Sequence, residues 1–174
     1  LHLSLRRQRQ MCIRDSCFIS EKNISLFTRW GIYTEREMRS RYDISLENYA
    51  KLIRIEASTM LSMAQRSILP AVIGYESKIA EAVSAKDRLG VPNDAEYALL
   101  KGLSAGVNAL HKRIGGLFDA IAAMPKGNGE AAEYCRDKLL PAMGSLREAA
   151  DALETITAKE YWPFPGYEDL LFNL

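Results

Sequence analysis

The chain has 174 residues, of which 48% are hydrophobic and 26% charged, and its 23 basic and 22 acidic side chains leave a formal net charge of +1. This composition is typical of one globular domain with its own core, and the near-neutral charge gives no reason to expect nucleic acid as a partner. No apolar run approaches the roughly 20 residues that a membrane-spanning helix requires, so we expect no membrane partner.

Residues 1–16 read LHLSLRRQRQMCIRDS, a basic segment without the continuous apolar core of a secretory signal. Its end, QMCIRDS, resembles translated sequencing-adapter read-through, so we expect residues 1–16 to be a foreign or disordered leader. The three cysteines, Cys12, Cys17 and Cys135, are too few and too unevenly placed for a disulfide framework. They complete no metal site, and a reducing, cytoplasmic setting is the simplest interpretation.

Apolar side chains recur at steps of three and four residues, which predicts helices over residues 21–30, 35–89, 94–123 and 130–158. Thr34 followed by Glu37 is a capping-box pattern at the start of the second helix. Poor helix formers at residues 43–45 predict a break near residue 44. Pro70 predicts a kink because proline lacks a backbone N–H and crowds the carbonyl four residues before it, and Pro141 should kink the last helix likewise.

One helix carries a seam that repeats without a gap. Its members are Leu100, Leu103, Val107, Leu110, Ile114, Leu117 and Ile121. Such a seam suits packing at a shallow angle along neighbouring helices, and short loops make successive helices antiparallel. The sequence therefore predicts an all-α fold, an antiparallel bundle of three long helices with a short N-terminal helix, over residues 17–159.

Residues 160–174 form a C-terminal tail that is rich in aromatic residues and proline. Its large apolar side chains are Trp162, Phe164, Tyr167, Leu170, Leu171 and Phe172. Pro163 and Pro165 forbid a regular helix at their positions. Because burial of such side chains outweighs the ordering of a short, proline-stiffened segment, we expect an extended tail docked on a surface, with one helical turn at residues 167–172. That surface is either the side of the bundle or another domain.

Few residues could carry chemistry. The histidines are His2, in the leader, and His111, for which we expect a half-exposed structural role. No Glu-x-x-His pair is present, which excludes the usual di-iron bundle site. The loop residues 127–129 lack the lysine, the hydroxyl residue and the preceding strand of a phosphate-binding loop. The sequence therefore predicts no catalytic, cofactor-binding or metal-binding residue.

Glu56 interrupts the apolar pattern between Ile53 and Met60, where a carboxylate would be partly desolvated. Three interpretations remain open: a residue at the boundary of the buried stripe, half of a buried ion pair with Arg54 of a neighbouring subunit or with another arginine, or a catalytic carboxylate. Upstream of Glu56 lies a run of charges that we interpret as a solvated face or as a surface facing another domain. Its members are Glu35, Arg36, Glu37, Arg39, Arg41 and Asp43.

Two separated blocks carry recognisable motifs. The first is RYDISLENY at residues 41–49 with IEA at residues 55–57, and the second is YWPFPGYEDLLF at residues 161–172. Together they resemble the C-terminal region of type III glutamine synthetase, the large bacterial form. In that family a RYE-x-x-LENY-like block opens a long helix with a later Leu-Pro-Ala kink, and the protein ends in a WPFP-T-Y-x-DLLF-like motif. Gly166 stands here where the family has a small hydroxyl residue. The resemblance covers residues 23–172.

The resemblance implies a parent enzyme that is a glutamate–ammonia ligase, using ATP and Mg²⁺ held by carboxylates of an upstream barrel domain. None of those strands or carboxylates is in this chain, so no family site residue is carried over. The chain is then expected to be a cytoplasmic fragment that packs against the barrel, contributes to a homo-oligomer, binds no cofactor itself and is inactive alone. The residues alone fit equally well a free-standing helical interaction module without catalysis.

Overall fold

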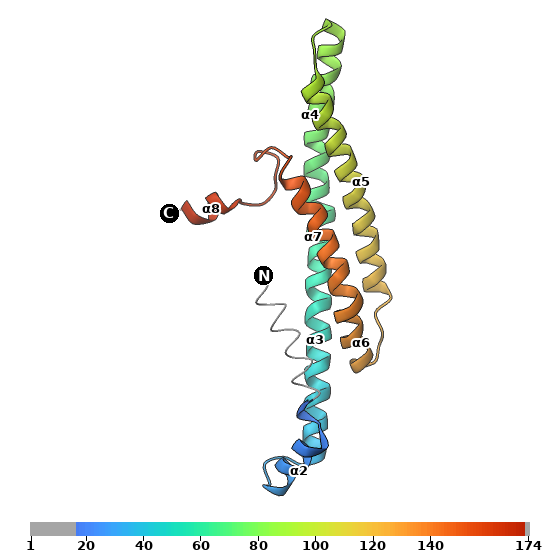
Figure 1. The fold of residues 1–174 in the computed structure, drawn as a ribbon, viewed down its shortest axis with the longest axis vertical. Coiled ribbons are helices and arrows are strands. Elements are labelled where there is room, and N and C mark those ends of the chain that lie inside the picture. Colours follow the sequence, from blue (N-terminus) through green and yellow to red (C-terminus); the bar gives the residue numbers. More distant parts are fainter. Residues whose placement is uncertain (1–16, 173–174) are drawn as a thin grey trace. The chain divides into compact units, whose positions relative to one another are not determined.

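The computed structural model describes residues 17–172, so the leader at residues 1–16 and residues 173–174 lie outside the described part. The elements in chain order are α2 (Glu21–Arg29), α3 (Glu35–Met63), η1 (Ala64–Ile68), α4 (Leu69–Leu89), α5 (Asp94–Ala122), α6 (Asn128–Tyr134), η2 (Cys135–Leu139), α7 (Leu140–Glu154) and α8 (Tyr167–Phe172) (Figure 1). The two η segments are π-helical turns. Residues 17–172 contain no strand, which confirms the all-α fold. No helix among them is both long and apolar enough to cross a bilayer.

The chain divides into two compact units, each built from two separated segments. The first unit comprises residues up to 53 together with residues 125–135, and thus α2, most of α3 and α6. Its buried side chains are Met38, Leu46, Tyr49, Ala50, Ile53, Ala131, Ala132 and Cys135. Cys135 is completely buried, and its Sγ lies 4.0 Å from the carbonyl oxygen of Ala50. Desolvation raises the pKa of the Cys135 thiol, which disfavours the reactive thiolate.

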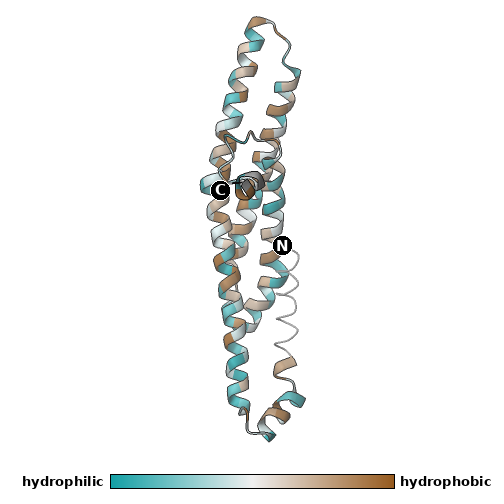
Figure 2. Ribbon diagram, turned by 90° about the vertical axis from the view of Figure 1, so that its left-hand side faces the viewer, coloured by the Kyte–Doolittle hydropathy of each residue, from teal (hydrophilic) through white to brown (hydrophobic). Residues whose placement is uncertain are grey.

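The second unit comprises residues 54–124 and 136 onward, and α5 is its central element because it packs against both α4 and α7. The buried residues of α5 are Leu103, Leu110, Ile114 and Leu117, all members of the predicted seam. They meet apolar side chains such as Val72 and Val83 of α4 and Met143, Leu146 and Leu153 of α7. Figure 2 shows apolar and polar residues alternating along the ribbons, as expected of helices with one buried face.

The turn between α4 and α5 ends one helix and fixes the start of the next. Gly90 adopts the left-handed conformation (φ 66°), and the N–H of Val91 donates to the carbonyl of Lys86. This is a Schellman motif, which glycine favours because it has no Cβ to clash. Lys86 also pairs with Glu96 at the start of α5, and this bond lowers the pKa of the Glu96 carboxyl. The short turn at residues 90–93 therefore makes α4 and α5 antiparallel neighbours.

The two prolines that lie within long helical segments each follow a π-helical turn. Pro70 and Pro141 each occupy the second position of their helix, after η1 and η2 respectively. In η1 the N–H of Leu69 donates to the carbonyl of Ala64, five residues back instead of four. This wider turn gives a proline ring room beside the carbonyl it would otherwise crowd. The irregularity that the sequence predicts near Pro70 is therefore present, in the form of a π turn.

Two boundaries differ from the prediction by more than two residues. The break expected near residue 44 is wrong, since α3 runs from Glu35 to Met63 without interruption. The helix propensity lost at residues 43–45 is less than about 0.7 kcal/mol per residue, and burial of Leu46 and Tyr49 outweighs it. The last long helix ends at Glu154 rather than at residue 158.

The end of α7 has a local cause. Thr155 Oγ1 donates to the carbonyl of Ala152 at 2.8 Å, and Thr157 Oγ1 donates to the carbonyl of Leu153 at 2.7 Å. Such side-chain bonds compete with the helical ladder, and the β-branched run at residues 155–157 is stiff at χ1.

The tail is only partly covered. The ring of Tyr161 lies 5.1 Å from that of Tyr75 on α4, and Trp162 and Phe164 are half-buried. The predicted helical turn is present as α8. Leu170 and Leu171 are 67% and 72% exposed, so docking of these two residues on the bundle is not observed. Docking of the tail on another domain stays a prediction.

Leu110 provides the test of the α5 seam. Its side chain is completely buried, so Leu110→Ala should lower the free energy of unfolding by about 2–5 kcal/mol through lost transfer energy and the cavity left behind. Phe118→Ala on the same helix, where the side chain is 57% exposed, should cost about 0.5 kcal/mol or less. Urea denaturation of both variants measures the difference, and equal midpoints would show that the seam is not buried.

Gly106 tests the contact between α5 and α7. A Cβ at this position would lie 2.5 Å from Cδ2 and 3.1 Å from Cγ of Leu153, which is itself buried. Gly106→Ala should therefore destabilise the chain by about 1–3 kcal/mol through overpacking. A Cβ on Gly116 meets nothing within 4 Å, so Gly116→Ala should stabilise by up to about 1 kcal/mol. Stabilisation by both substitutions would contradict the close approach.

Candidate functional site

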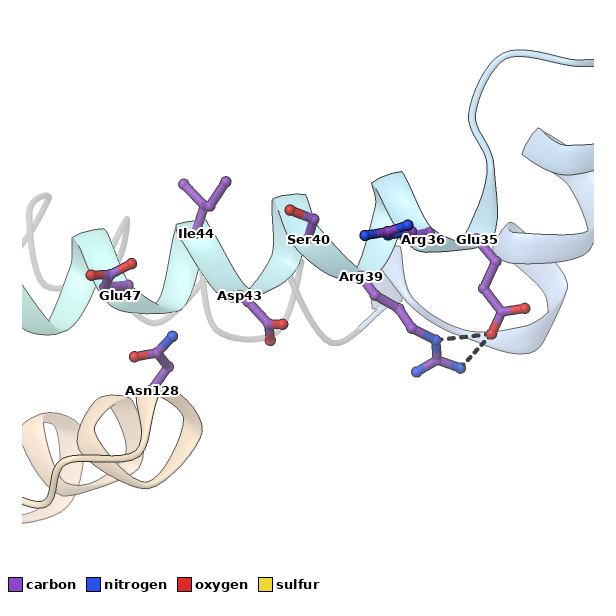
Figure 3. A pocket seen from close by; sticks show the side chains of 8 residues that line it. All are labelled: Glu35, Arg36, Arg39, Ser40, Asp43, Ile44, Glu47 and Asn128. Atoms are coloured by element: carbon purple, nitrogen blue, oxygen red, sulfur yellow. Dashed lines mark hydrogen bonds and ion pairs between the residues drawn. The ribbon is translucent and has the colours of Figure 1, made fainter.

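An open groove runs along the exposed side of α3 in the first unit (Figure 3). It encloses about 640 Å³ and is lined by Glu35, Arg36, Arg39, Ser40, Asp43, Ile44, Glu47 and Asn128. All but Asn128 come from α3, and Asn128 is the first residue of α6. Figure 3 shows the side chain of Asn128 directed toward α3, beside Asp43 and Glu47. The groove thus coincides with the charged run of the sequence.

A complete capping box positions the start of α3 and thereby the groove. The carboxylate of Glu37 accepts from the backbone N–H of Thr34 at 2.8 Å and from its hydroxyl at 2.9 Å, while the N–H of Glu37 donates to Thr34 Oγ1 at 3.3 Å. The Thr34–Glu37 pattern in the sequence is therefore confirmed. The N–H bond from Thr34, then its hydroxyl and the charge of Arg41, lower the pKa of the Glu37 carboxyl.

The charges of the groove largely neutralise one another on the same helix. Arg39 pairs with Glu35 at 2.7 Å and Lys51 pairs with Glu47 at 2.5 Å, both across one helical turn. Exposed pairs of this kind contribute about 0.3–0.5 kcal/mol each. No group of three or more His, Cys, Asp or Glu side chains within the described residues could hold a metal ion. The groove therefore has the character of a solvated face.

Glu56 and His111 have no buried role in the structure. Glu56 is exposed, which overturns the interpretation of a partly desolvated carboxylate. The buried stripe of α3 passes from Ile53 to Ala57, both fully buried, and so misses position 56. From Ile53, a step of three residues leads to Glu56 and a step of four leads to Ala57, and both steps fit a helix. Because the side chain of Ala57 is small, the sequence did not indicate that the step of four is the buried one. His111 is exposed rather than half-exposed.

Sequence reasoning missed an ion-pair clamp in the tail. Asp169 Oδ1 lies 2.8 Å from Lys159 Nζ, and Asp169 Oδ2 accepts from the N–H of Gly166 at 2.9 Å. The ion pair and then the Gly166 bond lower the pKa of the Asp169 carboxyl. The available signal was the spacing of Gly166 and Asp169, which is that of a capping box with glycine at its first position. The clamp holds the start of α8 to the end of the preceding segment.

The clamp predicts a pH dependence. Because the pKa of Asp169 is lowered in the folded chain, the clamp is complete above the ordinary pKa of an aspartyl group and is lost as the pH falls through the lowered value. The Gly166 amide resonance should follow this titration in NMR spectra, and Asp169→Asn should abolish it. A Gly166 shift that titrates equally in the Asp169→Asn variant would contradict the assignment.

The sequence of this chain is similar to a family model and to several known proteins. The family model described as "Glutamine synthetase C-terminal domain" matches residues 4–87, a range that begins inside the segment interpreted as a leader. The chain is 34% identical over 164 residues to "Glutamine synthetase" of Butyrivibrio fibrisolvens, which covers 90% of this chain and 23% of that protein. It is 32% identical over 162 residues to "Type-3 glutamine synthetase" of Dictyostelium discoideum, covering 88% of this chain and 22% of that protein.

A third relative, "Glutamine synthetase" of Bacteroides fragilis (strain YCH46), is 26% identical over 150 residues, covering 82% of this chain and 21% of that protein. The chain thus spans less than a quarter of the length of each of these curated relatives. The similarity extends over most of this chain, and the family model includes the first sequence block, at residues 41–57. The resemblance of this chain to the C-terminal region of type III glutamine synthetases is therefore confirmed.

Proposed function

We propose that this chain acts as the helical C-terminal part of a glutamine synthetase, an enzyme that ligates ammonia to glutamate at the expense of ATP. The observation that carries the proposal is the similarity to the Butyrivibrio fibrisolvens protein over 90% of this chain. In the proposal, ATP and Mg²⁺ bind to an upstream barrel domain of the parent protein. The helical part contributes packing and assembly of a cytoplasmic homo-oligomer and has no activity alone.

Exposed apolar side chains support a packing role. The largest exposed fractions belong to Trp30 at 71%, Leu89 at 77% and Leu171 at 72%. Single exposed apolar residues are normal on a protein surface. These three lie at the end of α2, at the end of α4 and on α8, positions where further chain or a further subunit could cover them. More than three quarters of the length of each relative lies outside the region that matches this chain.

A chimaera tests the function directly. Residues 23–172 of this chain replace the similar region of the Butyrivibrio fibrisolvens enzyme, and a matched control carries an unrelated three-helix bundle there. We expect the first chimaera to retain the oligomeric state and the synthetase activity, and the control to lose both. Loss of assembly and activity in both chimaeras would contradict the proposal and favour a free-standing interaction module.

The chain by itself should show no γ-glutamyl transfer, because the proposal assigns the metal and ATP phosphates to groups outside it. The purified chain is assayed with hydroxylamine, ADP and Mg²⁺ or Mn²⁺, with the Butyrivibrio fibrisolvens enzyme as the positive control. Transfer above the rate of a heat-denatured sample would overturn the predicted inactivity.

A further inference from the structure

The first turn of α6 is unusual in its chemistry. It begins with Asn128 followed directly by Gly129, and both residues are exposed. An asparagine side-chain amide can be attacked by the backbone nitrogen of the next residue, and glycine hinders this attack least because it has no Cβ. The reaction requires that this nitrogen be accessible and that the backbone leave the helical conformation.

The structure leaves the nitrogen of Gly129 accessible. The first backbone bond of α6 runs from the N–H of Ala131 to the carbonyl of Gly127 at 2.8 Å. The N–H of Gly129 precedes that bond and belongs to the group of helix-initial donors that have no partner within the helix. A hypothetical Cβ on Gly129 would meet nothing within 4 Å, so no side chain from another part of the fold packs against the Cα of this residue.

Few interactions stabilise this first turn of α6. Gly127 is the N-cap residue, and no side chain caps the helix. Glycine at the N-cap costs a helix start only a few tenths of a kcal/mol relative to Ser, Thr, Asn or Asp, but it provides no side-chain acceptor for the first N–H groups. The α-helical part of α6 spans only 7 residues before the π turn η2, and short helices without caps fray at their ends. The backbone of Asn128 can therefore leave the helical conformation without unfolding the first unit.

We infer that Asn128 and Gly129 form a site of spontaneous succinimide formation, which needs no enzyme. The reaction converts position 128 to a mixture of aspartyl and isoaspartyl residues. The backbone nitrogen of Gly129 bonds to Cγ of Asn128, the bond from Cγ to Nδ2 breaks, and ammonia leaves with the amide proton. Water then adds across one of the two imide C–N bonds. Opening at Cγ gives the aspartyl product, and opening at the main-chain carbonyl gives the isoaspartyl product.

The modification changes the groove. Its lining contains three acidic side chains and two basic ones before the reaction, and the product adds a carboxylate beside Asp43 and Glu47 (Figure 3). The isoaspartyl product also lengthens the backbone by one methylene at the start of α6. Ala131 and Ala132 follow immediately and are 4% and 3% exposed, so the added length displaces residues of the core.

Ageing of the full chain at mildly alkaline pH tests the inference. Peptide mass spectrometry measures conversion at Asn128 and at Asn108, which is also exposed but lies within α5 before Ala109. Enzymatic methylation of isoaspartyl groups identifies the second product. We expect conversion at position 128 first, with both products, and faster amide exchange at Ala131 and Ala132 in the converted fraction. Equal conversion at the two asparagines would overturn the inference.

Two variants separate the mechanism from general instability. Gly129→Ala should fold normally, because the added Cβ meets no atom within 4 Å and alanine favours the helix, yet it should lose most of the conversion. Asn128→Asp provides the spectrum of the aspartyl product and should release no ammonia from this position. Unchanged conversion in Gly129→Ala, or an aspartyl product without the isoaspartyl one, would show that a succinimide is not formed.

Discussion

The close contact between α5 and α7 is the constraint on which the second unit depends. Gly106 leaves no room for a side chain beside Leu153, so the two helices approach at the distance of a backbone against a leucine. Leu110 of α5 and Leu146 of α7 are buried in this unit, and α4 also packs against α5. Burial of such side chains is worth about 1.5–3 kcal/mol each, and the absence of a Cβ at Gly106 allows it without strain between α5 and Leu153.

Much of the fold could be predicted because its helices obey simple periodicities. The seam of α5, the capping box at Thr34 and Glu37 and the stop at Gly90 each depend on residues close in sequence. The break expected near residue 44 depended on local propensity alone, and burial of Leu46 and Tyr49, whose partners lie elsewhere in the fold, overrides it. The sequence also indicates where proline disturbs a helix, but not that a π turn accommodates it.

The candidate site was less predictable, for two physical reasons. The charged run on α3 is readable as a solvated face, yet the contribution of Asn128 to the groove requires that α6 return to α3. Glu56 was wrongly expected to be partly buried because a helix of 3.6 residues per turn permits steps of three and four residues. The small side chain of the alanine that follows it does not show which of the two positions is buried. The Asp169 clamp lies within the second sequence block, at residues 161–172. The spacing of Gly166 and Asp169 in that block does not indicate that Lys159 pairs with the aspartate.

The interleaving of the two units has a consequence for how the chain can be divided. Residues 125–135 complete the first unit, but they stand between the two segments of the second, so neither unit is one uninterrupted stretch of polypeptide. During synthesis, the contact between Ala50 and Cys135 can form only after more than eighty further residues have been added to the chain. The chain passes between the units three times, and a truncation at the second of these points, after residue 124, removes part of both cores. Any boundary chosen for expression, fusion or circular permutation has to keep all four segments together.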